Sequence, residues 1–166
     1  IINDLLGVLA STPDSPERWQ HEVALRMSLA GAKTLVHGFT GETEDAYETA
    51  LTIVREHGEV PQLFPALRGI GSFHAFRGEF DKGIHYANEI LRLADAQDDA
   101  SMRVHGYVML GAGTGFSGRL EEGLGYLDES IRAFEIGGYR PRRLRFGVDP
   151  RMSSLTTSGF FLWLLG

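Results

Sequence analysis

Apolar residues along this chain recur at intervals of three and four positions, which is the spacing of an amphipathic α-helix. A clear example is the stretch 80–96, where Ile84, Ala87, Ile90 and Leu91 fall on one face of a helix. No stretch of useful length alternates apolar and polar residues as a half-buried β-strand would. The pattern therefore predicts an all-α chain.

The predicted helices come in pairs that are separated by short polar stretches. Ser15 before Pro16, and Asp149 before Pro150, each place a helix-capping side chain ahead of a proline in the first turn. The predicted order is the tail of a preceding helix at 1–10, helix pairs at 16–58, 60–97 and 98–136, a basic loop at 137–149, and the first helix of a truncated fourth pair at 150–166. We expect these elements to stack as one solenoid domain.

Glycines recur at the predicted turn inside each helix pair. Six-residue segments with acidic residues begin at Gly41, Gly78 and Gly118, and these leading glycines are 37 and 40 residues apart. Intervals of about 20 to 50 residues are typical of stacked repeats. We expect each leading glycine to supply the left-handed turn that ends the first helix of its pair.

Small residues at matched positions would let the two helices of a pair approach closely. Gly71 and Gly111 lie seven residues before a turn glycine, and Gly159 stands in the same relation to Gly166. In the first pair, Thr34 occupies this position. The second helices offer small residues of their own, Ala46, Gly83 and Gly123. This spacing predicts helices that nest against one another in a spiral stack.

These positions resemble the tetratricopeptide repeat, a motif of two antiparallel helices. The motif's two small residues match Gly71 and Gly83, its turn glycine matches Gly78, and a large apolar residue matches Leu67. The next unit repeats the match with Gly111, Gly123, Gly118 and Tyr107. The intervals are longer than in that motif, and its closing proline is missing. The resemblance implies an α-α superhelix, a right-handed solenoid of antiparallel helix pairs, that mediates protein–protein interaction.

A narrower similarity covers most of the chain. The segments 12–18, 63–67 and 146–150 are similar to the C-terminal repeat arm of large bacterial signalling ATPases of the AAA/STAND type. In that family the arm accompanies a nucleotide-binding module and an adenylate or guanylate cyclase, a kinase, or a LuxR-type DNA-binding domain. The similarity implies a sensor arm of a signalling or transcriptional regulator. Its expected partners are proteins, peptides or other domains of the parent chain.

Composition narrows the classes of function. The chain has 166 residues, no cysteine and a formal net charge of -6. The lack of cysteine excludes thiol catalysis, zinc–thiolate sites and disulfides, and the negative charge argues against direct nucleic-acid binding. No apolar run reaches the length of a membrane span. We therefore expect a cytoplasmic domain that does not contact a membrane.

Residues 113–118 match the glycine pattern of dinucleotide-binding folds, and they follow an apolar stretch that could pass for a strand. However, Gly111 and Gly118 stand in register with Gly71 and Gly78, where no such pattern exists. The fingerprint also requires a parallel sheet, for which the chain offers no second strand. We therefore interpret these glycines as part of the helical repeat.

No other pattern of residues points to catalysis or to a metal. The six histidines are His21, His37, His57, His74, His85 and His105. They form no H-x-x-x-H pair, so isolated surface histidines or hydrogen-bonded core histidines are the expected roles. The chain has neither a P-loop nor a nucleophile elbow. We expect a non-catalytic chain with no cofactor and no metal site.

A cluster of arginines stands out in an otherwise acidic chain. Four of them lie within six residues of the predicted basic loop, namely Arg140, Arg142, Arg143 and Arg145. Guanidinium groups bind phosphates and carboxylates well, so this loop could dock an anionic partner such as an acidic surface of the parent protein. The other interpretation is a solvated loop whose arginines pair with acidic helix starts.

The concave groove of the predicted solenoid is the remaining candidate site. Residues of the first helices that would face it are Arg68, Ser72, Phe76, His105, Val108, Ala112, Phe116, Thr156, Phe160 and Trp163. Phe39, Phe76 and Phe116 each precede a turn glycine by two residues and would form a ridge of aromatic rings. Such a stripe is more typical of a core. If it is exposed, the groove suits a peptide with apolar anchors.

Two further expectations concern occupants of the surface. A small molecule, such as a nucleotide or an inducer, is the alternative ligand for the groove. The final helix carries the apolar run 160–165 without a second helix to cover it. We expect possible self-association through this face, because large exposed apolar patches mark interaction sites.

Overall fold

The computed structural model describes residues 2–57, 60–137 and 149–166. These residues form eight α-helices and no strand, so the prediction of an all-α chain is confirmed for the described residues. The helices are α1 (Ile2–Ala10), α2 (Pro16–His37), α3 (Gly41–His57), α4 (Val60–Phe76), α5 (Phe80–Gln97), α6 (Ala100–Phe116), α7 (Leu120–Ile136) and α8 (Pro150–Leu165).

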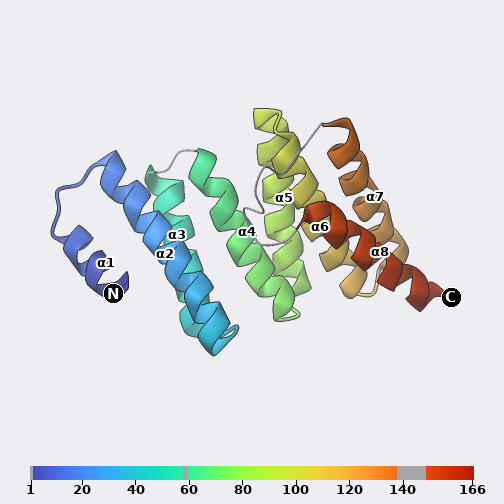
Figure 1. Ribbon diagram of the computed structural model, residues 1–166, viewed down its shortest axis with the longest axis horizontal. Helices are drawn as coiled ribbons and strands as arrows, with labels where there is room; N and C mark the ends of the chain where they lie inside the picture. The colour runs from blue at the N-terminus through green and yellow to red at the C-terminus, as the bar shows by residue number, and fades with distance from the viewer. Residues whose placement is uncertain (1, 58–59, 138–148) are drawn as a thin grey trace.

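The helices are lined up in chain order, with the two ends of the chain at opposite ends of the molecule (Figure 1). Each helix from α1 to α8 contacts the next one along the chain, and the closest association is that of α6 with α7. Helices α2, α4, α6 and α8 also contact one another in sequence. The arrangement is a row of helical hairpins, in which α8 lies across α6 and α7 (Figure 1).

The helix starts follow from local sequence. The Ser15 side chain accepts a hydrogen bond from the Arg18 backbone N–H, and Pro16 occupies the first turn of α2. Asp149 caps α8 in the same way by accepting from the N–H groups of Arg151 and Met152. Both predicted caps are therefore confirmed, because each satisfies N–H groups that have no partner inside the helix.

The turn glycines repeat more regularly than the sequence indicated. Positive φ angles of 74°, 78° and 98° occur at Gly38, Gly78 and Gly118, a constant interval of 40 residues. Gly41 was expected to be the first of this series, and that prediction is wrong, since Gly41 is the first residue of α3. Gly38 and Gly41 are three residues apart, and either could form this turn on sequence grounds. The positive φ angle identifies Gly38 as the residue at which the chain turns.

The 40-residue interval also corrects the register of the small residues. Gly31, rather than Thr34, matches Gly71 and Gly111. On the second helices the match to Gly83 and Gly123 is Thr43, which is fully buried, rather than Ala46. The error follows directly from placing the first turn three residues too late.

Close helix approach is confirmed at two of the three predicted glycines. A Cβ on Gly71 would lie 3.0 Å from Tyr86 Cβ of α5, and a Cβ on Gly111 would lie 2.9 Å from the Gly123 carbonyl oxygen of α7. The third prediction, Gly159, is wrong, because this glycine is exposed and a Cβ there would meet no atom within 4 Å. In α8 the neighbouring Phe161 makes the buried contact instead.

The hydrophobic core follows the row of helices. Its central cluster joins α3, α4 and α5 and reaches the start of α6. The buried members are Leu51, Phe64, Ala66, Leu67, Ile70, Ile90, Ala94 and Met102. Beside this core, residues of α4, α5, α6 and the start of α8 line a hollow.

Buried hydroxyl groups help to attach α8 to the row. Ser130 of α7 donates a hydrogen bond to the Val104 carbonyl oxygen of α6 at 3.1 Å. The Ser154 hydroxyl of α8 donates a hydrogen bond to Ser130 Oγ at 3.0 Å, and the Pro150 carbonyl oxygen lies 3.1 Å from the same hydroxyl. One turn further along α8, the buried Ser158 hydroxyl has no hydrogen-bond partner among the described residues.

These two serines should respond to alanine in opposite directions. Ser158→Ala should stabilise the protein by about 1 kcal/mol, because it removes a buried unsatisfied hydroxyl and adds a better helix former. Ser154→Ala should destabilise it by about 1–2 kcal/mol, because Ser130 loses a buried partner. Thermal unfolding of the two variants checks this, and a lower melting temperature for Ser158→Ala would contradict it.

Candidate functional site

A hollow of about 460 Å³ is lined mainly by residues of α4 and α6. Helix α5 and the start of α8 complete its wall. Seven of the ten predicted groove residues line this hollow, namely Arg68, Ser72, Phe76, His105, Val108, Ala112 and Phe116. They come from two helices that are far apart in the sequence and are brought together by the packing of α4 on α6.

The sequence did not predict the other residues that line the hollow. Its other lining residues are Gly71, Ala75, Phe80, Gly83, Met109, Gly113, Pro150 and Ser153. Several of these residues are small. Gly71 and Gly83 allow α4 and α5 to pack closely, and both also line the hollow. The recurrence of small residues was the signal for helix contact, but nothing in the sequence indicated that they would also border a cavity.

One end of the hollow is polar. Arg68 of α4 and His105 of α6 line it beside Ser153 in the first turn of α8. The His105 side chain is buried, and its ring lies 5.7 Å from the Phe64 ring. Burial, together with the nearby Arg68 charge, lowers the pKa of His105 to about 4. His105 is therefore uncharged at neutral pH, and it brings hydrogen-bonding nitrogens without a second positive charge.

The other end of the hollow is aromatic and open. Phe76 and Phe116 end α4 and α6, and their side chains are 74% and 50% exposed. Phe39, in the turn before α3, is 38% exposed and stacks on Phe76 with the ring centroids 5.3 Å apart. The interpretation of these rings as core residues is therefore wrong. They lie close to the turn glycines, and neighbouring aromatic rings cover them only in part.

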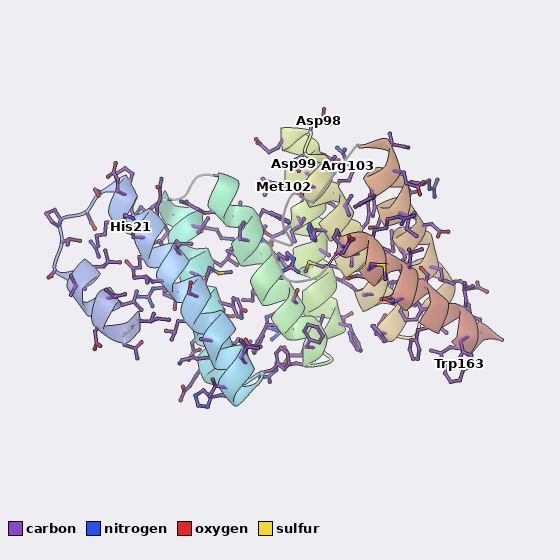
Figure 2. All side chains as sticks on the ribbon, viewed as in Figure 1. His21, Asp98, Asp99, Met102, Arg103 and Trp163 are labelled. Atoms are coloured by element: carbon purple, nitrogen blue, oxygen red, sulfur yellow. The ribbon has the colours of Figure 1, made fainter. Side chains whose placement is uncertain are left out.

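The three predicted groove residues on α8 lie outside the hollow. Phe160 extends the aromatic ridge, because its ring centroid is 6.1 Å from that of Phe116 and 6.1 Å from that of Trp163. Trp163 lies near the far end of α8 (Figure 2). Thr156 is exposed and donates a hydrogen bond to the Met152 carbonyl oxygen of its own helix. The predicted groove therefore consists of two parts: the hollow, and an aromatic ridge of Phe39, Phe76, Phe116, Phe160 and Trp163 that extends beyond it along α8.

The sequence also predicted two other candidate sites. The arginines Arg140, Arg142, Arg143 and Arg145 lie outside the described residues. The glycine pattern at 113–118 falls on the last turns of α6, where Gly113 faces Ile84 and Gly115 faces Phe161. A dinucleotide fingerprint needs a strand before its glycines, and helix occupies that position here. The nucleotide-binding interpretation of this pattern is therefore wrong.

A charged cluster at the turn between α4 and α5 has a structural role. His74 is fully buried, and its Nδ1 lies 2.8 Å from Glu79 Oε2. Hydrogen bonds from Lys82, His74 and Arg77 lower the pKa of Glu79 to about 2. Glu44 of α3 lies 3.7 Å from Lys82 Nζ. Although His74, Glu44 and Glu79 could together face a metal ion, Lys82 and Arg77 already neutralise the two carboxylates.

Comparison with known proteins adds no relative. No protein-family model matches the chain, and no curated protein is similar to it in sequence. Among the described residues, no helix combines the length and apolar character that crossing a membrane requires. The case for function therefore rests on the hollow and the aromatic ridge.

Proposed function

We propose that this chain is a non-catalytic, tetratricopeptide-like interaction domain that binds a peptide segment of a partner protein along the hollow and its aromatic ridge. The observation that carries the proposal is that seven residues predicted to face a groove line one hollow, with Phe76 and Phe116 exposed at its rim. Exposed aromatic rings beside a depression are typical anchors for a bound peptide. The row of hairpins with a 40-residue repeat supports a solenoid.

The proposal extends to the parent protein through the similarity of segments 12–18 and 63–67 to the repeat arms of bacterial signalling ATPases. In this proposal the domain is a cytoplasmic sensor that reports a bound partner to a neighbouring effector domain.

The exposed apolar residues of α8 add a second contact surface, suited to self-association or to another domain. They include Met152, Leu155, Leu162, Leu164 and Leu165.

Alanine at both rim positions tests the peptide site. Peptides selected from a random display library on the wild-type protein should bind the Phe76→Ala/Phe116→Ala variant at least about tenfold more weakly, because aromatic anchors dominate binding energy. The melting temperature should change by no more than about 3 °C, since both rings are largely exposed. Ile136→Ala, which removes an exposed apolar residue of α7, is the matched control. Unchanged affinity in the double variant would reject the site.

A small-molecule ligand is the second candidate. It is favoured by the size of the hollow, because 460 Å³ falls within the range of about 300–1,000 Å³ that small-molecule sites occupy. A thermal-shift screen separates the two candidates, since a small ligand at about 100 times its Kd stabilises the folded state by about 2.7 kcal/mol.

A further inference from the structure

We propose that the hollow and the aromatic ridge bind a basic segment of a partner protein. The apolar side chains of the segment would lie in the hollow, and its Lys or Arg side chains would pair with carboxylates at the starts of α5 and α7. This inference rests on the proposed peptide-binding function and specifies the class of peptide.

Most of the side chains that line the hollow are apolar. Among its lining residues the polar or charged ones are Arg68, Ser72, His105 and Ser153. At the aromatic end the rings of Phe80 and Phe116 stack with their centroids 6.2 Å apart. A segment that binds here must therefore present apolar side chains, because burying polar groups without partners is unfavourable.

Two further depressions border this surface. The α5 depression is lined by residues 78–82, Phe116 and Ser117, and it shares Phe80 and Phe116 with the hollow. The α7 depression is lined by residues 118–122 and by Leu165 of α8, the helix that carries Phe160 and Trp163 of the ridge. The two depressions occupy equivalent places in the repeat, since residues 78 and 118 are its turn glycines.

Both depressions are acidic. Each is lined by two carboxylates and one cation, so each carries a formal charge of -1. The charged residues are Glu79, Asp81 and Lys82 in the α5 depression, and Arg119, Glu121 and Glu122 in the α7 depression. An apolar surface that is bordered by negative charge in two places favours a partner whose apolar residues are accompanied by basic ones.

In each depression the protein's own cations already pair with one of the two carboxylates. Lys82 Nζ lies 2.9 Å from Glu79 and Arg77 Nε lies 2.7 Å from it. In the α7 depression, an Arg119 guanidinium nitrogen lies 3.1 Å from Glu122. Glu79 and Glu122 are therefore not the groups that a partner would contact first.

Asp81 and Glu121 are the remaining carboxylates. Both are exposed, and they hold equivalent positions in the first turns of α5 and α7. Neither forms an ion pair or a side-chain hydrogen bond with another described residue. The helix N-terminus favours a carboxylate at such a position, but the oxygens keep lone pairs that a Lys or Arg side chain can bond. We therefore assign these two carboxylates to the basic residues of the partner.

The polar end of the hollow does not exclude a basic segment. Arg68 lies there, about 12 Å along α4 from Phe76. It already interacts with other groups of the protein, and its charge acts on His105 in the opposite direction to that of Asp149. Because charges of both signs act at this end, the acidic depressions at the aromatic end determine the preference.

Charge should set the selectivity of the site, whereas the apolar anchors should provide most of the affinity. Exposed ion pairs contribute little individually, and buried aromatic contacts contribute more. An acidic segment would place like charges against Asp81 and Glu121, which is unfavourable. The formal net charge of -6 adds a long-range attraction for a basic partner.

Selection of short peptides from a random display library on the wild-type protein tests the preference. In the selected peptides, Lys and Arg should outnumber Asp and Glu at least about twofold relative to the unselected library, next to apolar anchors. A synthetic copy of the tightest peptide, with its Lys and Arg residues replaced by glutamine, should bind about 5- to 30-fold more weakly.

Reversal of the two carboxylates locates the contact. Asp81→Lys/Glu121→Lys should weaken binding of the tightest peptide about 5- to 30-fold, because attraction is replaced by repulsion. Glu48→Lys/Asp128→Lys is the matched control. It makes the same change in net charge at two exposed carboxylates that line neither the hollow nor the depressions. This control should change the affinity by less than about twofold.

The outcomes separate the basic partner from the peptide site itself. If binding depends on Phe76 and Phe116 but shows neither the basic preference nor a response to Asp81→Lys/Glu121→Lys, the basic-partner proposal is wrong and the peptide site stands. If the selected peptides are insensitive to Phe76→Ala/Phe116→Ala, they bind elsewhere and the proposed function fails as well. Equal weakening by the control variant would show that overall charge attracts the peptide, which also overturns the assignment of Asp81 and Glu121.

Circular dichroism melts establish that each variant folds. Should Asp81→Lys/Glu121→Lys fail to fold, Asp81→Asn/Glu121→Gln removes the same two charges with little change in side-chain size. This variant should weaken the tightest peptide at least about threefold, since it removes attraction without adding repulsion. Wild-type affinity in this variant would overturn the proposal.

Discussion

Gly123→Ala should destabilise the protein by about 1–3 kcal/mol, although alanine is the better helix former. Gly123 is buried where α7 meets α6. A Cβ at this position would lie 2.7 Å from the Gly115 backbone nitrogen and 2.8 Å from the Gly111 carbonyl oxygen. Backbone atoms inside a helix cannot rotate away as a side chain can, so α6 and α7 must separate. Thermal unfolding should show a melting temperature about 2–12 °C lower.

Gly125→Ala is the matched control, two residues further along the same helix. Gly125 is exposed, and a Cβ there would meet no atom within 4 Å. The substitution should therefore stabilise the protein by about 0.5–1 kcal/mol through helix propensity alone. If both variants shift the melting temperature in the same direction, the close approach of α6 and α7 at Gly123 does not determine stability.

Phe161→Ala should have a larger effect, a loss of about 3–5 kcal/mol. The Phe161 ring is fully buried, and it occupies the notch that Gly115 leaves on α6. A Cβ on Gly115 would lie 2.0 Å from this ring, so ring and notch fit each other closely. Because α8 contacts only α6 and α7 among the described helices, losing the ring should release α8 before the rest of the row.

Hydrogen exchange measures this release directly. Amides of α8 should lose protection in Phe161→Ala, while those of α4 and α5 keep it. Phe160→Ala is the control, because its neighbouring ring is 44% exposed and should affect stability by less than about 1 kcal/mol. Unchanged protection of α8 in Phe161→Ala would show that other contacts, such as the Ser154 hydrogen bond, hold this helix.

The regular elements could be predicted because their causes are local. The spacing of apolar residues and the caps at Ser15 and Asp149 depend on neighbours within a few residues, and the structure has helices at these places. The first turn was misplaced because Gly38 and Gly41 are both suitable in sequence. Their difference is a backbone angle, positive only at Gly38.

The candidate site could be predicted in part for the same reason. Phe76 and Phe116 each lie two residues before a turn glycine, at equivalent positions of the repeat. The expectation that the first helix of a pair faces the groove therefore applied to both. Whether they were buried could not be decided, because exposure depends on what packs beside the ends of α4 and α6. The same rule failed for Thr156, Phe160 and Trp163, which do not line the hollow, since α8 lies across its neighbours.

The sequence by itself determined that this protein is helical, where most of its helices begin, and that helices touch at Gly71 and Gly111. These properties depend on side-chain periodicity, capping and steric size, which act over short distances. The tertiary structure alone decided that small residues of α4, α5 and α6 surround a hollow, and that Arg68 lies at its polar end while Phe76 stays open to solvent. Those properties depend on how distant helices pack, because only packing decides which surfaces remain uncovered.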